Sequence, residues 1–515
     1  MKPLPIGIQT FRKLVEGNYL YVDKTKKIYS LIENASGSYF ISRPRRFGKS
    51  LTLSVLDEIF SANKDLFRGL YIYDSPWEWK KHPVLRFDFS KQKAKNKEEL
   101  IQFLFEELED NSKRHGISLE RTSYVAQFQE LITQLGNKGG VVILIDEYDK
   151  PIIDHIENEE IALEMREIMK GFFTVLKGSD PYIRFLLLTG VSKFSKAGVF
   201  SNLNHLHDIT LEDAFSDLIG ITEDELEFNF KQYIEVLGIK ESMDYFSTIT
   251  KIRDWYNGYR FSPEGKSVYN PFSTLLLFTQ FRFEHHWFET GTPEFLVKLI
   301  LKNQYDILEI PMQVEALDFS SYEVDDLSLT PLLLQTGYLT IKDFDSVTKN
   351  YTLDYPNAEV RQAFLNYFLR KIHKRNIISS PTIKLYNAFQ KEDVEEIFNV
   401  IKEVFTNIEY DLQIHQEKYY QTIFYLLFNL LGYYIQTEVK TNRGRIDAVV
   451  ESKSIFIFEF KLNASKEEAL GQIKEKKYYE RYIPKGKKIY LLGVEFRNRN
   501  LGEYLVEIIP MSNMT

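Results

Sequence analysis

An unbroken apolar segment, VVILID at residues 141–146, constrains the fold of this chain more than any other segment. A strand without polar alternation is typical of a parallel sheet that is covered on both faces. Further strands are expected at 37–42, 84–89 and 182–190, and segments with helical periodicity lie between them. Strands that alternate with helices predict an α/β, doubly wound domain over about residues 1–210.

The pattern changes after this domain. Residues 211–290 are mainly helical in pattern, and residues 291–382 are mixed and carry no chemistry that we can assign. Residues 383–515 combine helices with a set of three strands, two of them joined by a tight turn, and then a charged helix and a final strand at 487–496. We therefore expect two α/β modules separated by a helical and a mixed region.

Composition restricts the class of protein. The chain has no cysteine, which excludes disulfides, cysteine-bound zinc and iron–sulfur clusters. Its N-terminus lacks the apolar core of a secretion signal, and the longest apolar stretch, residues 423–435, is shorter than the roughly 20 residues of a membrane span. We expect a cytoplasmic location. The net charge of −8 argues against a generally basic surface but leaves room for a local basic groove.

The segment SYFIS–RPRRFGKSL predicts a loop that binds phosphate. Gly48 would let the backbone approach a phosphate, Lys49 would reach the β- and γ-phosphates, and Ser50 would offer a hydroxyl to Mg²⁺. The usual pattern has a glycine where this chain has Arg43, so the match is incomplete. The remaining residues of the expected nucleotide-binding stretch are Arg46, Phe47 and Leu51.

The acids that follow the strand at 141–146 supply the second half of a nucleotide site. Asp146 would hold Mg²⁺, and Glu147 would polarise the attacking water. A surface acidic loop around Glu147 and Asp149 is the alternative. Together with the loop, this strand favours ATP as the ligand. Another strand ends in Thr189 and Ser192, where a polar side chain would sense the γ-phosphate, although a capped strand end explains these residues equally well.

A charged cluster near the C-terminus predicts a second site. Asp447 lies in one β-branched run, and Glu459 and Lys461 end the next. Two strands joined by the tight turn ESKS would bring the three side chains together. Two carboxylates and an ammonium group suit a divalent metal ion that acts on a phosphodiester. A structural strand would show the same alternation. The residues expected to pack on the opposite face are Phe458 and Phe460.

Several longer motifs carry a family resemblance: GNYLYVDKT, RPRRFGKS, LIDEYDKPI, TGVSKFS, YNGYRF, YNPFS and ETGTP. Through them, nearly the whole chain resembles the AAA-ATPase-like proteins of bacteria, in which a PD-(D/E)XK nuclease-like domain typically follows the ATPase region. The resemblance implies an AAA-like P-loop core over 1–210, a helical lid-like region over 211–290, a connecting region over 291–382 and a mixed α/β nuclease fold over 383–515. It also implies that Arg43 is usual at its position in this group.

The same resemblance assigns roles in the C-terminal module. Asp447 and Glu459 would bind Mg²⁺. Lys461 would orient the attacking water or help to deprotonate it, and would offset charge in the transition state.

Supporting residues follow by the same comparison. Glu438 on the preceding strand and Glu417 on the preceding helix are additional metal candidates. Gln421 stands where relatives often have a histidine, which puts a catalytic histidine on that helix in doubt. Gln472 matches a glutamine that contacts DNA or the site, whereas Lys476 replaces a tyrosine found in some relatives.

The nucleic-acid contacts are less specific. Arg443 and Arg445 could touch backbone phosphates, and a role as solvated turn residues is an equal alternative. We expect an ATP-binding and ATP-hydrolysing protein with a Mg²⁺-dependent nuclease domain. Its partner would be nucleic acid, DNA in preference to RNA, with no membrane and with room for a homo-oligomer. The alternative is a nucleotide-dependent switch or remodelling ATPase whose nuclease fold only binds nucleic acid or protein.

Overall fold

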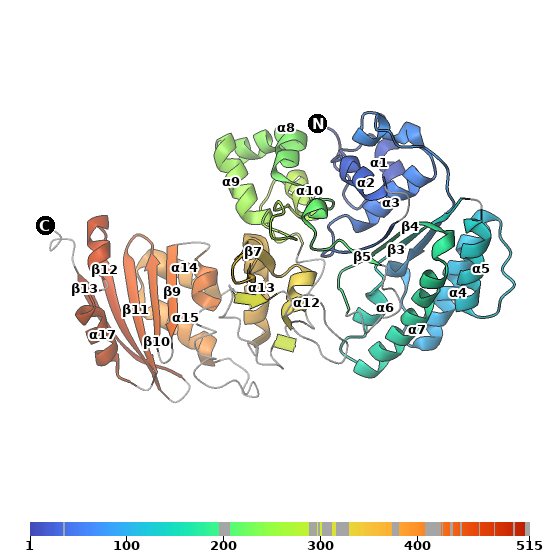
Figure 1. Ribbon diagram of the computed structural model, residues 1–515. Helices are drawn as coiled ribbons and strands as arrows, with labels where there is room; N and C mark the ends of the chain where they lie inside the picture. The colour runs from blue at the N-terminus through green and yellow to red at the C-terminus, as the bar shows by residue number, and fades with distance from the viewer. Residues whose placement is uncertain are drawn as a thin grey trace. The chain divides into compact units, whose positions relative to one another are not determined.

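The chain divides into two compact units in the computed structural model, which is drawn in Figure 1. The first contains Met1–Phe295 and Ile310–Arg361, and the second contains Leu296–Glu309 and Gln362–Thr515. The residues that the structure describes are 1–33, 37–137, 139–194, 206–287, 296, 299–300, 312–315, 329–372, 381–406, 424, 426–432, 436–442, 445–462, 464–477, 479–497 and 500–509.

A five-stranded parallel sheet organises the first unit, in the order β2–β3–β4–β1–β5. The strands are β1 (Gly37–Ser42), β2 (Val84–Asp88), β3 (Val141–Asp146), β4 (Ile183–Gly190) and β5 (His207–Asp208). The predicted doubly wound α/β fold is confirmed, and the short strand β5 is an addition to it. Because β4 lies between β1 and β3, the carboxyl ends of all three strands meet at one edge, where open α/β sheets bind ligands.

Helices cover both faces of this sheet (Figure 1). Phe87 of β2 packs on Phe128 and Phe172, with ring centroids 5.0 and 5.4 Å away, whereas Phe185 of β4 packs on Phe60 at 5.2 Å. The helices are α1 (Phe11–Glu16), α2 (Thr25–Ile32), α3 (Lys49–Phe60), α4 (Lys97–His115), α5 (Tyr124–Gly136), α6 (Lys150–Ile153) and α7 (Glu159–Gly178). Burial on both faces explains why the strands lack polar alternation.

Local signals set the ends of α4, one of the two longest of these helices. At the start of α4, the side chain of Asn96 accepts a hydrogen bond from the backbone N–H of Glu99. At its end, Gly116 adopts φ 64°, a left-handed conformation that glycine adopts without a Cβ penalty.

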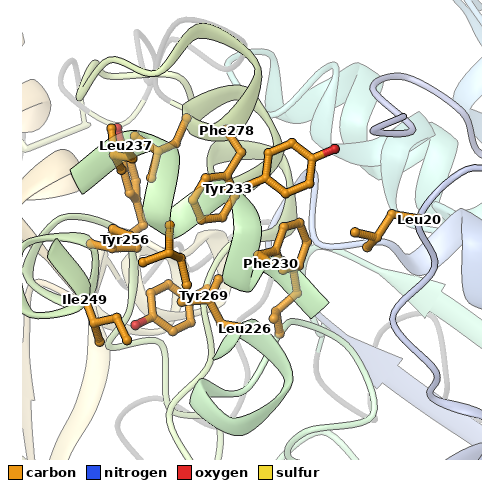
Figure 2. Packing of buried hydrophobic residues seen from close by; sticks show 13 residues of the cluster. Leu20, Leu226, Phe230, Tyr233, Leu237, Ile249, Tyr256, Tyr269 and Phe278 are labelled. Carbon is orange, nitrogen blue, oxygen red and sulfur yellow. The ribbon is translucent and has the colours of Figure 1, made fainter. Parts of the chain in front are cut away.

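A helical region follows the sheet and has its own core, shown in Figure 2. It contains α8 (Glu223–Glu241), α9 (Tyr245–Tyr256) and α10 (Pro271–Gln280). Phe230 of α8 and Phe278 of α10 stack with centroids 5.1 Å apart. Leu20, from the N-terminal segment, belongs to the same buried cluster, so this core joins the helical region to the start of the chain.

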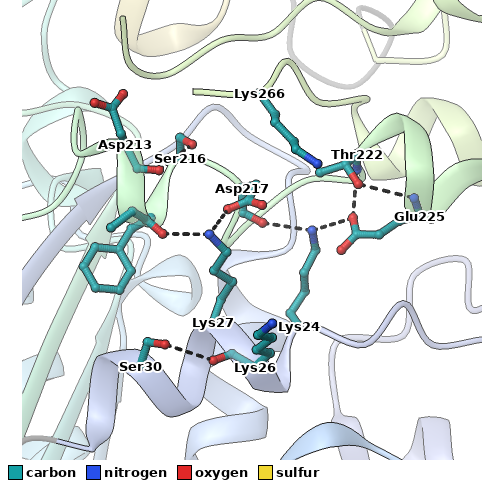
Figure 3. Close-up of polar contacts among 12 residues, drawn as sticks. Lys24, Lys26, Lys27, Ser30, Asp213, Ser216, Asp217, Thr222, Glu225 and Lys266 are labelled. Carbon is teal, nitrogen blue, oxygen red and sulfur yellow. Dashed lines mark hydrogen bonds and ion pairs between the residues drawn. The ribbon is translucent and has the colours of Figure 1, made fainter. Parts of the chain in front are cut away.

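Two lysines near the N-terminus bind to the segment that connects β5 with α8 and to the start of α8 (Figure 3). Lys24 Nζ donates to the carbonyl of Asp217 at 2.9 Å and to Glu225 Oε2 at 2.6 Å. Lys27 Nζ lies 2.7 Å from Asp217 Oδ1. Glu225 also accepts from the backbone N–H of Thr222 in a capping box, so one carboxylate starts α8 and binds Lys24.

The rest of the first unit is a small antiparallel sheet with one adjoining helix. The sheet has the order β6–β8–β7, and α12 precedes β7. These elements are β6 (Met312–Glu315), α12 (Leu329–Thr336), β7 (Thr340–Phe344) and β8 (Asn350–Asp354). The next helix, α13 (Ala358–Ile372), contains the division between the two units.

The second unit is built on a mixed sheet in the order β13–β12–β11–β10–β9, in which only β11 and β12 pair in parallel. Its elements are α14 (Pro381–Lys391), α15 (Val394–Thr406), β9 (Gln436–Asn442), β10 (Arg445–Glu451), β11 (Ile455–Leu462), α17 (Lys466–Glu475), β12 (Ile489–Arg497) and β13 (Asn500–Ile509). The prediction that 487–496 holds the final strand is wrong, because β13 pairs with β12 after a short connection.

Candidate nucleotide and metal sites

The phosphate loop connects β1 directly to α3. Gly48 has φ 108°, and a Cβ placed there would meet nothing within 4 Å, so glycine is needed for its backbone freedom and not for space. Arg46 has φ 67°, in the left-handed region that costs an ordinary residue about 1 kcal/mol. The first backbone N–H groups of α3 have no intrahelical acceptor and are therefore available to an anion at the loop.

Lys49 lies folded into this loop. Its side chain is 5 % exposed, and Nζ donates to the carbonyls of Arg43 at 2.9 Å and Pro44 at 3.1 Å. Burial lowers the pKa of Lys49, and the nearby charge of Glu147 opposes this shift. The lysine is thus held at the loop in the field of Glu147, the residue that follows β3.

Arg43, which stands in the place of the usual glycine, does not face the pocket. Its guanidinium is buried and donates to the carbonyls of Ser42 at 2.8 Å, Thr210 at 2.9 Å and Phe215 at 3.2 Å. It also lies 4.1 Å from the ring centre of Phe261. Arg43 therefore joins the start of the loop to the segment after β5, and burial lowers its pKa.

Aromatic residues that follow α9 support the other side of the loop. Phe47 packs edge-on against Tyr259 and Phe261, with centroids 4.8 and 5.6 Å away. The indole N–H of Trp287 donates to the carbonyl of Arg45 at 2.9 Å. The segment YNGYRF, at residues 256–261, and Trp287 therefore hold the loop in shape. No local sequence signal predicts these contacts.

Asp146, the last residue of β3, and Glu147, which follows it, lie in different surroundings. Asp146 is 3 % exposed, and Oδ1 accepts a hydrogen bond from Thr189 Oγ1 at 2.7 Å. Glu147 has φ 51° and lines the pocket with Lys49. Burial raises the pKa of Glu147, and the nearby charge of Lys49 opposes this shift. The residue expected to polarise water thus shares the pocket with the loop lysine.

An open pocket of about 440 Å³ brings most of the predicted residues of this site together. Those that line it are Arg46, Gly48, Lys49, Ser50, Leu51 and Glu147. Asp146 and Thr189 are not part of its lining. Phe47 instead lines a neighbouring apolar cavity of about 100 Å³, which shares Gly48 and Leu51 with the first pocket.

Asp149 has no role in the sequence interpretation, which named it only in the alternative of a surface acidic loop, and the structure buries it. Its side chain is 1 % exposed. Oδ2 accepts from the backbone N–H of Val191 at 3.0 Å, and from the backbone N–H and hydroxyl of Ser192, both at 2.7 Å. Burial raises the pKa of Asp149, and the bonds from Ser192 oppose the shift. The spacing of acids in LIDEYD is the only local signal that could have drawn attention to it.

In the second unit, the register of β10 and β11 places the predicted residues Asp447, Glu459 and Lys461 near one another along the hairpin. Asp447 of β10 pairs with Glu459 of β11, and Arg445 pairs with Lys461, across the antiparallel hairpin. The predicted turn at residues 452–454 joins the two strands. Glu459 is fully buried, and Lys461 Nζ lies 3.5 Å from its Oε1.

Gln472 of α17 contacts this pair. Lys461 Nζ donates a short hydrogen bond to Gln472 Oε1. The glutamine predicted as a contact to DNA or to the site therefore orients the lysine in this structure. The opposite face of β11 is aromatic: Phe460 lies 3.9 Å from Phe424, and Phe458 lies 5.5 Å from Phe428, between ring centroids. This is the alternation that the sequence predicts.

Several predicted residues are described only in part. Glu417, Gln421 and Arg443 lie outside the described residues. Glu438 and Asp447 are described as members of strands β9 and β10 by their backbone pairing.

The donor chemistry at both sites fits a hard divalent cation, because Asp146 and Glu459 are buried carboxylates and Ser50 supplies a hydroxyl at the pocket wall. Within the described side chains, no group of three or more histidines and acids forms a ready-made metal cluster. None of the helices in the described part of the chain combines the length and hydropathy needed to cross a bilayer.

The first unit has a phosphate loop beside a strand that ends in an acid. The second has a mixed sheet that carries a buried glutamate next to a partly buried lysine. These features define an ATPase-like protein with a nuclease-like module. Comparison with known proteins agrees. Residues 5–200 match the family model described as predicted AAA-ATPase, and residues 415–502 match the PD-(D/E)XK nuclease superfamily. The chain belongs to the AAA-ATPase-like proteins that carry a C-terminal PD-(D/E)XK nuclease-superfamily domain.

A full-length relative supports this membership. The chain is similar to the "Uncharacterized protein in vnfD 5'region" of Azotobacter chroococcum mcd 1, with 40% identity over 526 residues. The match covers 98% of this chain and 99% of that protein, so both modules and the regions between them are shared.

Proposed function

We propose that the first unit binds ATP with Mg²⁺ and hydrolyses it. The observation that carries this proposal is the convergence of Lys49, Ser50 and Glu147 on one open pocket, with Asp146, the residue before Glu147, bound by the hydroxyl of Thr189. Lys49 would leave the loop carbonyls to bind the β- and γ-phosphates. Glu147 would orient a water molecule for attack on the γ-phosphate.

Asp146 and Ser50 would hold the cation, which neutralises charge on the phosphate oxygens when bound. The neighbouring apolar cavity supports a nucleotide as the ligand, because it opens beside Gly48 and Leu51 and offers apolar walls to a base. Its walls include Leu20 and Val22 of the N-terminal segment and Ile221 near the start of α8.

We infer that the second unit cleaves phosphodiester bonds in nucleic acid, DNA in preference to RNA. Support comes from the register of Asp447 and Glu459, since residues paired across an antiparallel ladder share one face of the sheet. These carboxylates would hold a divalent cation that stabilises charge on the scissile phosphate. Lys461, oriented by Gln472, would place its ammonium group at the attacking water. The acid at Glu438, the arginines at Arg443 and Arg445, and the helix acid Glu417 remain proposed contributors.

One set of assays tests both proposals on the purified full chain. ATP hydrolysis and the cleavage of single-stranded DNA, duplex DNA and RNA are measured with Mg²⁺ or Mn²⁺ and with EDTA. Lys49→Ala should abolish hydrolysis of ATP, and Lys461→Ala should abolish cleavage, because each removes the ammonium group at its site. The matched controls replace exposed lysines of the same two units, Lys177→Ala in α7 and Lys453→Ala in the turn between β10 and β11.

The outcomes separate the two modules. Hydrolysis of ATP that depends on Lys49, without cleavage of any substrate, would reject the nuclease proposal. The protein would then be a nucleotide-dependent switch or a remodelling ATPase. Cleavage that persists in Lys461→Ala would indicate a contaminating nuclease. Rates of ATP hydrolysis with and without DNA show whether the modules communicate.

A further inference from the structure

We propose that Asp149 is a positioning residue for Glu147, which it holds in its catalytic conformation by fastening the loop after β3 to the end of β4. This inference rests on the proposed ATP hydrolysis. Asp149 lines the same pocket as Glu147, but its carboxylate is bound to the residues after β4. It would therefore not touch the reacting atoms, and its effect would pass through the backbone of Glu147. The argument depends on the contacts of Asp149, on the packing of Tyr148 and on the backbone conformation of Glu147.

The first observation is the number of hydrogen bonds on one oxygen. Asp149 Oδ2 accepts from Val191 N at 3.0 Å and from Ser192 N and Oγ, both at 2.7 Å. All three donors belong to the residues that directly follow β4. A buried carboxylate with this many short bonds resists displacement, since breaking them would leave polar groups unsatisfied.

Tyr148 reinforces the same junction. Its backbone N–H donates to the carbonyl of Thr189 at 3.1 Å, and its hydroxyl donates to the carbonyl of Ser192 at 3.0 Å. A Cβ built on Gly190 would lie 2.6 Å from the ring of Tyr148 and 2.8 Å from Asp149 Oδ1. The strand end and the loop are therefore packed so closely that position 190 accommodates only glycine.

The backbone of Glu147 is the element that this junction controls. Its φ of 51° lies in the left-handed region, which costs a non-glycine residue about 1 kcal/mol or more. Such a conformation persists when its surroundings determine it. The next two residues, Tyr148 and Asp149, are both bound to the end of β4. Glu147 is thereby turned into the pocket that contains Lys49.

Removal of the carboxylate should therefore impair the hydrolytic step more than nucleotide binding. Asp149→Ala removes the acceptor, frees the loop and should lower kcat by about tenfold to a hundredfold, the range expected when a catalytic group moves by about an ångström. KM and the dissociation constant of a non-hydrolysable ATP analogue should stay within about threefold, because the hydrogen bonds of Lys49 to the loop carbonyls do not involve Asp149. Asp149→Asn keeps an acceptor oxygen and should retain most of kcat.

A double-mutant cycle with Glu147→Gln is the decisive experiment. If Asp149 acts through Glu147, Asp149→Ala should lower kcat in the wild-type background and have little further effect in the Glu147→Gln background. Asp110→Ala replaces an exposed acid of α4 and serves as the control. Thermal unfolding of each variant, with and without the ATP analogue, shows that the fold and the phosphate site are retained.

The failure of each proposal is distinguishable. A wild-type chain that does not hydrolyse ATP would reject the proposed function itself. A wild-type chain that hydrolyses ATP, with Asp149→Ala equally fast, would overturn only the positioning role. Equal losses of kcat in both backgrounds would also overturn it, because Asp149 would then act independently of Glu147.

Discussion

The hydroxyl of Thr189 donates a 2.7 Å hydrogen bond to Oδ1 of Asp146, and both side chains are buried. Asp146 is the last residue of β3, and Thr189 is the last but one of the neighbouring parallel strand β4. Since β4 lies between β3 and β1, this bond connects the acid to the strand that pairs with β1, from which the phosphate loop begins. Thr189 therefore binds the expected metal ligand, and we propose that it fixes the direction of that carboxylate.

Thr189→Val should test this relationship, because valine keeps the shape of threonine but loses the hydroxyl. Asp146 would lose a hydrogen bond in a buried position, which costs about 1–3 kcal/mol of the free energy of unfolding. The proposed hydrolysis of ATP should slow, and Mg²⁺ should be needed at a higher concentration for half-maximal rate. Chemical denaturation and a Mg²⁺ titration of the rate measure the two effects.

Thr133→Ala is the control for this variant. It removes a hydroxyl that bonds only within its own helix, to the carbonyl of Gln129. An unchanged Mg²⁺ requirement in Thr189→Val would contradict a role in directing Asp146.

The difference between local and distant contacts decides how much of this molecule could be predicted from its sequence. The strands and the pairing of Asp447 with Glu459 follow from periodicity and a tight turn, so they were within reach of the sequence. The bonds of Asp149 join residues 42 and 43 positions apart, and those of Arg43 reach Thr210 and Phe215. No local pattern encodes such contacts, because they depend on the completed sheet.

Arg43→Gly restores the glycine of the usual phosphate loop and should nevertheless destabilise the protein. The change removes three hydrogen bonds to backbone carbonyls and leaves a cavity beside Phe261. We expect the free energy of unfolding of the first unit to fall by at least about 3 kcal/mol. The measurement is chemical denaturation followed by tryptophan fluorescence, since all four tryptophans lie in the first unit.

The matched variant for this prediction is Arg45→Ala. Arg45 is an exposed neighbour that lines the pocket, so its loss should leave the unfolding free energy almost unchanged. A stable Arg43→Gly protein would show that the buried guanidinium is dispensable.

Glu392 should give the second unit a stability that depends on pH. Its carboxylate accepts from Ser454 Oγ at 2.6 Å and Tyr490 Oη at 2.7 Å, and these bonds, with Lys488, lower its pKa from 4.5. A carboxyl with a depressed pKa contributes stability above its unfolded pKa and loses it as pH falls through the folded value. The stability advantage of the wild type over Glu392→Gln should therefore be complete near neutral pH and shrink below about pH 4.5.

Hydrogen exchange of peptides from β11 and β12, compared between variants at each pH, measures this difference. Glu395→Gln, at an exposed position on α15, controls for the loss of one negative charge. A difference that stays constant from neutral to acidic pH would show that the bonds of Glu392 do not favour its charged form.

Gln472→Ala distinguishes the orientation of Lys461 from direct contact with DNA. Lys461 Nζ donates to Gln472 Oε1, so the loss of the amide should leave the ammonium group mobile and slow the proposed cleavage by about tenfold. The dissociation constant for DNA, measured with EDTA present to prevent cleavage, should remain unchanged. A glutamine that binds DNA would show the reverse: weaker binding, with a cleavage rate that recovers at saturating DNA.

Gln472→Glu adds a second comparison, because it keeps an acceptor for Lys461 and places a negative charge where DNA would approach. It should support cleavage by the lysine while weakening DNA binding in low salt.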